Sequence, residues 1–72
     1  MMDMAFAALD HLNQQLISES NRRADAGDLT MHREVNAHIQ GIYEDNRAGR
    51  MSDAVLRGYL AAAQEIHDKY IS

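Results

Sequence analysis

Imidazole groups are the side chains in this sequence best suited to bind a metal ion, and four are present: His11, His32, His38 and His67. A zinc site needs ligands that converge on one point, and ligands on a helix are typically three or four residues apart. No two of the histidines have this spacing, although Glu34 stands one turn before His38. His38 also lies between Val35 and Ile39 in an apolar stripe, where a core histidine with one hydrogen bond is the ordinary interpretation. The sequence therefore predicts no metal site.

Groups that could carry out catalysis are sparse. Cysteine is absent, so the chain has no thiol nucleophile, no thiolate metal ligand and no disulfide. It contains neither a Gly-x-Ser-x-Gly nucleophile motif nor a glycine-rich loop of the kind that binds phosphate. A chain of 72 residues also leaves little room for a deep pocket. We expect no enzymatic activity and no cofactor.

Arginines around the second glycine-containing segment could contact phosphate. Arg47, Arg50 and Arg57 flank this segment, and the helix that follows it could act as a recognition helix. However, Arg47 suits the negative end of a helix dipole, and Asp53 would face a phosphate with the wrong sign. The formal net charge of −4 also opposes a phosphate backbone. A small DNA-binding or transcriptional regulator that uses the second and third helices is therefore the alternative, and nucleic acid is not the expected partner.

Asn13 interrupts an apolar stripe in the first third of the chain. In a heptad pattern Phe6 and Asn13 take a positions, while Leu9 and Leu16 take d positions. Asn at an a position fixes the register and the number of strands in a coiled coil. The alternative is an Asn at the half-wet edge of a three-helix core. On the first interpretation, the predicted surface for self-association or partner binding consists of Phe6, Leu9, Asn13, Leu16 and Ile17.

Helical elements must position these residues. Proline is absent and hydrophobic residues make up 46% of the chain, with charged residues at 25%, which is typical of a globular protein. Apolar residues recur at three- and four-residue steps in each third of the sequence, a pattern typical of amphipathic helices. The sequence predicts helices over about 3–25, 31–46 and 53–70, in a single all-α domain that spans residues 1–72.

Two connectors of matching pattern join the predicted helices, Ala26-Gly27-Asp28-Leu29-Thr30 and Ala48-Gly49-Arg50-Met51-Ser52. In each, a glycine suits the left-handed turn that ends a helix, an apolar residue can pack back, and a hydroxyl side chain can cap the next helix. Short connectors make consecutive helices antiparallel. We therefore expect a three-helix bundle, or a helical hairpin extended by a long N-terminal helix.

Small residues form a strip on the third predicted helix: Ala54, Gly58, Ala61 and Ala62. Gly41 and Gly58 each cost roughly 1 kcal/mol relative to Ala in a helix interior, so another feature should favour them. The strip could let another helix approach closely. Alanines that serve only helix propensity explain it equally well.

The expected partner and cellular location rest on features that the sequence lacks. The N-terminal residues do not resemble a signal peptide, and the apolar run from Met4 to Leu9 is far shorter than the roughly 20 residues that cross a membrane. The absence of cysteine fits the cytoplasm. Without a disulfide or a metal, a small chain can gain stability by dimerising, and a well-packed monomer is the alternative. We expect a cytoplasmic helical module that binds, and so regulates or occludes, a larger protein, as a homodimer.

Overall fold

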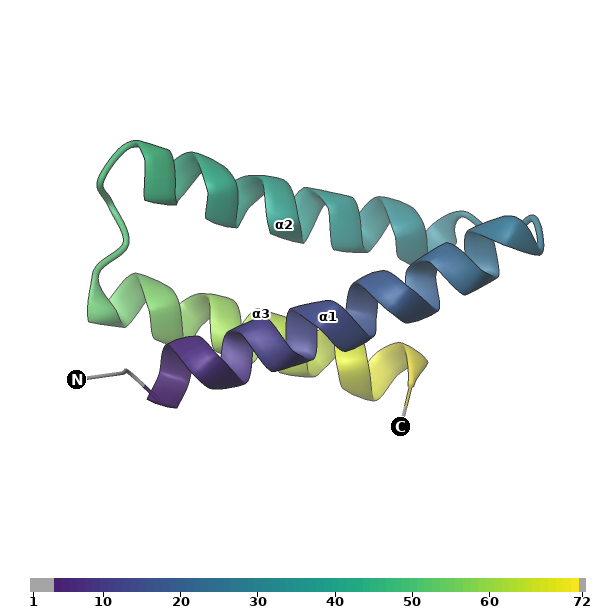
Figure 1. The fold of residues 1–72 in the computed structure, drawn as a ribbon, viewed down its shortest axis with the longest axis horizontal. Helices are drawn as coiled ribbons and strands as arrows, with labels where there is room; N and C mark the ends of the chain where they lie inside the picture. The colour runs from purple at the N-terminus through teal and green to yellow at the C-terminus, as the bar shows by residue number, and fades with distance from the viewer. Residues whose placement is uncertain (1–3, 72) are drawn as a thin grey trace.

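The computed structural model describes residues 4–71, which form three α-helices (Figure 1). Helix α1 spans Met4–Asp25, α2 spans Thr30–Arg47 and α3 spans Asp53–Tyr70. The predicted all-α three-helix fold is confirmed. The predicted bounds of the second and third helices differ from these by at most one residue, and the predicted start of the first helix at residue 3 lies outside the described residues.

The three helices pack in two layers. Helices α2 and α3 run in opposite directions beside each other, and α1 crosses them diagonally on one side (Figure 1). The Cα atoms extend over 39 × 24 × 16 Å, so the shortest dimension holds only two layers of helix. Because α1 contacts both other helices from one side, the opposite side of the α2–α3 pair remains uncovered.

The core is small and draws on all three helices. It consists of the buried side chains Leu9, Leu16, Met31, Val35, Leu56, Ala63 and Ile66. At the end of α1, Arg23 Nη2 donates a hydrogen bond of 2.7 Å to the carbonyl oxygen of Tyr70 and so joins α1 to α3. Hydrogen bonds from Arg22 and Arg23 lower the pKa of the Glu19 carboxyl to about 2. This cluster fixes the C-terminal end of α1 against the C-terminal end of α3.

Both connectors end their helices in the same way, as their shared sequence pattern predicts. Gly27 has φ +93° and Gly49 has φ +74°, which is the left-handed conformation that glycine adopts without steric cost. In the first connector the amide of Asp28 bonds to the carbonyl of Arg23 at 2.9 Å, and in the second the amide of Arg50 bonds to that of Asp45 at 2.8 Å. These six-to-one bonds define a Schellman motif at each helix end.

The two connectors begin the next helix differently. The Ser52 hydroxyl accepts a hydrogen bond of 3.2 Å from the amide of Val55, so Ser52 caps α3 as predicted. The predicted cap at Thr30 is wrong, because Thr30 is the first residue of α2 and the preceding Leu29 makes no side-chain cap. Here the Asp28 carboxylate accepts the Thr30 amide at 3.1 Å, so the helix begins one residue earlier. Arg50 replaces this carboxylate in the second connector and cannot accept such a bond.

Alanine substitution of three glycines should separate backbone conformation from helix propensity. Gly27→Ala and Gly49→Ala place a Cβ in the left-handed region, which costs about 1 kcal/mol at each position. Gly58→Ala is the matched control within α3 and should stabilise by up to about 1 kcal/mol, because Ala favours helix. None of the three added Cβ atoms has a neighbour within 4 Å. Urea unfolding measures these changes, and the same sign at all three positions would contradict the left-handed role of the connector glycines.

Candidate functional site

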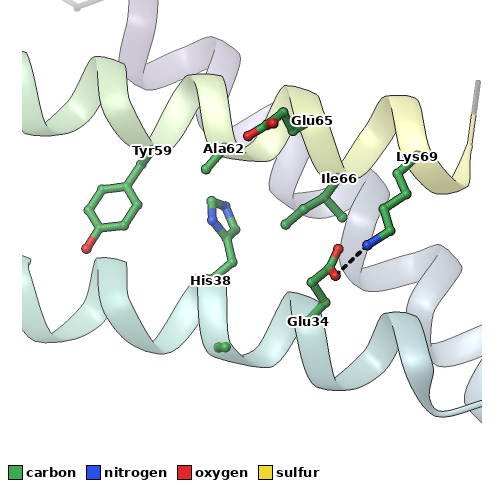
Figure 2. Close-up of a pocket in the computed structure, with 8 residues that line it drawn as sticks. Glu34, His38, Tyr59, Ala62, Glu65, Ile66 and Lys69 are labelled. Carbon is green, nitrogen blue, oxygen red and sulfur yellow. Dashed lines mark hydrogen bonds and ion pairs between the residues drawn. The ribbon is translucent and has the colours of Figure 1, made fainter.

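A groove runs between α2 and α3 on the side away from α1 (Figure 2). Its volume is about 660 Å³, and we call it the α2–α3 groove. Helix α2 contributes one wall and helix α3 the other. The groove is lined by Glu34, Ala37, His38, Tyr59, Ala62, Glu65, Ile66 and Lys69.

Polar contacts between the two helices mark both ends of the groove. At one end Lys69 Nζ donates a hydrogen bond of 2.9 Å to Glu34 Oε1, and this pair raises the pKa of Lys69 (Figure 2). At the other end the Tyr59 hydroxyl donates to Asp45 Oδ2. This bond raises the pKa of Tyr59 and, together with a hydrogen bond from Arg50, lowers the pKa of Asp45. The α2 members of these contacts, Glu34 and Asp45, are separated by about three helical turns, or roughly 16 Å.

Small residues create the space between these two contacts. Ala37 on α2 and Ala62 on α3 both line the groove, and neither side chain is long enough to fill it. Gly41 lies where the Tyr59 ring crosses α2, and a Cβ on Gly41 would stand 3.2 Å from the Tyr59 hydroxyl oxygen. The close approach of Tyr59 therefore accounts for one of the two glycines within helices.

The inner side of the groove holds a buried histidine. The side chain of His38 is 9% exposed, and its Nε2 lies 2.9 Å from Oδ1 of Asn13 on α1. Because an amide oxygen can only accept, the imidazole donates from Nε2 and keeps Nδ1 as an acceptor. The ring also meets Tyr59 edge-on, with centroids 6.0 Å apart. Burial lowers the pKa of His38, so its neutral form is favoured.

Some residues of the predicted association surface are buried in the structure, and others are exposed. Leu9 and Leu16 are 3% and 0% exposed and belong to the core of this chain. Asn13 is half-buried and bonded to His38, which matches the alternative of an Asn at the edge of a three-helix core. Phe6 and Ile17 remain 57% and 40% exposed. Of the five predicted residues, these two leave most apolar surface for another molecule.

A smaller hollow of about 130 Å³ lies where α1 meets α2, lined by Phe6, Leu9, Asp10, Asn13 and Ile42. Tyr43, the next residue along α2, is 61% exposed. Sequence reasoning missed Tyr43 because it lies outside the main stripe of α2, although Ile39 precedes it by one turn. Eleven residues, or about three turns, place Ile17 on nearly the same side of α1 as Phe6 but roughly 16 Å farther along the helix. We call Phe6, Ile17, Ile42 and Tyr43 together the α1–α2 face.

The residues of the predicted small-residue strip of α3 also differ in position, because only one of them lines the α2–α3 groove. Ala62 lines the α2–α3 groove, and Gly58 stands one turn before it with open space at its Cβ position. Ala54 and Ala61 are exposed and do not line the groove. The strip therefore forms the edge of one groove wall and continues onto the outer surface of α3.

The arginines that suggested phosphate binding lie next to carboxylates. Arg50 Nε and Arg57 Nε each stand 2.9 Å from an aspartate oxygen, of Asp45 and Asp53 respectively. Within residues 4–71 no three His, Cys, Asp or Glu side chains are grouped as a metal site. Over the same residues no helix combines the length and the apolar character needed to cross a membrane.

Comparisons with protein-family models, with curated proteins and with solved structures gave no match. The chain is therefore defined by its class, a small three-helix bundle with an open groove between α2 and α3 and an exposed apolar face on α1 and α2.

The burial of neutral His38 should make stability fall on mild acidification. The unfolded chain binds a proton on this imidazole near pH 6.5, whereas the folded chain binds it only at lower pH. The contribution is therefore complete above about pH 6.5 and decreases below it. Thermal melts from about pH 8 to pH 5.5 should show a larger loss in the wild type than in His38→Gln, which can still bond to Asn13 but does not titrate. Parallel losses in both proteins would contradict the burial of a neutral His38.

Proposed function

We propose that this chain is a cytoplasmic protein-binding module that forms a homodimer and regulates or occludes a larger protein. The observation that supports dimerisation is the exposure of large apolar side chains on the α1–α2 face, where Phe6, Ile17 and Tyr43 are 57%, 40% and 61% exposed. Of these three side chains, Phe6 lines the hollow between α1 and α2. Exposed large apolar side chains are typical of contact sites between proteins.

A second copy of the chain is the occupant that suits the α1–α2 face. Burial of Phe6, Ile17 and Tyr43 on two copies removes on the order of 600 Å² of mainly apolar surface. Small specific interfaces bury about 1,200 Å² in total, of which slightly more than half is apolar. Dimerisation also adds apolar burial to a core that, within residues 4–71, has seven buried apolar side chains, in a chain without cysteine.

The larger partner would use the α2–α3 groove. The α1–α2 face and the groove use different sides of α2, because Ile42 lines the hollow beside α1 whereas Ala37 lines the groove beside α3. A dimer formed through the α1–α2 face leaves the groove accessible. A small binding module can regulate a larger protein by covering part of its surface. A segment bound in the groove would no longer be accessible to the other molecules that it contacts. We also propose a cytoplasmic location, because a chain without cysteine suits a reducing compartment.

Nucleic acid receives less support than protein as a partner. The carboxylates of Asp45 and Asp53 offset the positive charge of Arg50 and Arg57. A phosphate would have to displace these carboxylates while approaching a chain with net charge −4.

A charge placed on the α1–α2 face should dissociate the dimer. Ile17→Glu should shift the mass measured by sedimentation equilibrium from dimer to monomer, because dimerisation would then bury an unpaired carboxylate. Ile71→Glu is the matched control, since Ile71 is 38% exposed against 40% for Ile17 but lies just beyond α3. Phe6→Glu should act like Ile17→Glu.

The wild-type mass decides this proposal. A wild-type chain that stays monomeric at high micromolar concentration contradicts the homodimer. Circular dichroism of each variant, recorded at the same concentration, separates loss of association from loss of folding. Dissociation by Ile71→Glu, with Ile17→Glu still dimeric, would instead assign self-association to a different surface.

A further inference from the structure

We propose that the α2–α3 groove binds a basic amphipathic helix of the larger protein, with one large apolar side chain seated beside His38. This inference rests on the proposed function, because it specifies the class of partner that the module covers. The groove is uncovered along the side opposite α1 (Figure 2). Its volume of about 660 Å³ leaves room for a large side chain from another molecule.

The shape of the groove suits a helix that lies along it. The contacts Lys69–Glu34 and Tyr59–Asp45 mark its ends, about three helical turns apart. Between them Ala37 and Ala62 keep the walls low, so another helix can approach to the axis separation of about 8–10 Å at which helices pack. A partner helix in this position would cover one side of the α2–α3 pair, as α1 covers the opposite side.

The interior of the groove favours one apolar anchor. Ile66 is 8% exposed and contributes apolar surface, as do the methyl groups of Ala37 and Ala62. The polar member, His38, donates from Nε2 to Asn13 and meets Tyr59 edge-on, so its ring is held in place, and its Nδ1 is an acceptor. Large side chains that fill such a position carry most of the affinity of helix-in-groove complexes.

The charges on the groove favour a basic partner. Its lining carries two carboxylates, Glu34 and Glu65, and one ammonium group, Lys69, which pairs with Glu34. Glu65 is exposed on the wall formed by α3, where it can meet a Lys or Arg one turn from the anchor. The net charge of −4 on the whole chain favours the same sign of partner at longer range.

Synthetic helical peptides can test this inference on the intact protein. Ten peptides of equal length would combine five anchor residues, Ala, Leu, Met, Phe and Trp, with flanking positions that are all Lys or all Glu. We expect the Lys series with a large anchor to bind and to shift the NMR signals of Ala37, Ala62 and the His38 ring. An Ala anchor should weaken binding about tenfold or more. Raising the salt concentration should weaken the binding of the Lys peptides, because salt screens the attraction between opposite charges.

Matched variants assign the binding to the groove. Ala62→Leu fills the space between the two walls and should weaken binding about tenfold, whereas Ala61→Leu adds the same side chain outside the groove and should leave binding unchanged. Glu65→Gln should weaken only the Lys series. The proposal is overturned if no peptide binds, if the Glu series binds as well as the Lys series, or if Ala61→Leu and Ala62→Leu behave alike.

Sedimentation of the same variants keeps this inference separate from the homodimer. Ala62→Leu should leave the oligomeric mass unchanged, and Ile17→Glu should still bind the Lys peptides. If Ala62→Leu instead dissociates a dimer, the groove holds a second copy of the chain and the proposed partner helix is wrong. A wild-type monomer that binds the peptides would contradict the homodimer alone.

Discussion

The hydrogen bond between His38 and Asn13 is the constraint on which the arrangement of the helices depends. A buried imidazole without a partner is costly, and in this core Asn13 on α1 supplies an acceptor at 2.9 Å. Apolar side chains alone would permit α1 to slide or rotate on the α2–α3 pair, because hydrophobic contact is not directional. A hydrogen bond has a required distance and angle, so it selects one position of α1. The His38–Asn13 bond holds the middle of α1 against α2, and the hydrogen bond from Arg23 to the carbonyl oxygen of Tyr70 holds the C-terminal end of α1 against α3.

The same histidine determines the shape of the open groove. Its ring meets Tyr59 edge-on, and Tyr59 then crosses Gly41 to reach Asp45. Contacts of this kind hold α2 and α3 at a separation that Ala37 and Ala62 cannot bridge. The groove therefore exists before any partner arrives, and a preformed site loses less conformational entropy when it binds.

Local sequence patterns were sufficient for the helices and for the way they end. The bounds of the second and third helices, the left-handed glycines and the cap at Ser52 depend on residues a few positions apart. The cap at Thr30 was wrong because the Asp28 carboxylate accepts a hydrogen bond from the Thr30 amide and α2 already begins at Thr30. Contacts between helices could not be predicted in this way. His38 and Asn13 are 25 residues apart, and their meeting depends on how α1 is rotated about its axis.

The candidate surfaces, like the contacts between helices, could be predicted from the sequence only in part. Amphipathic periodicity marked Leu9, Leu16, Phe6 and Ile17 as apolar, but it could not say which of them the chain's own core would use. Only packing distinguishes the buried leucines from the exposed pair. Asn13 lines the hollow beside the α1–α2 face, and His38 lines the α2–α3 groove, so a single hydrogen bond separates the two surfaces. The contact that holds α1 against α2 thus also relates the positions of the hollow and the groove, since its two residues each line one of them.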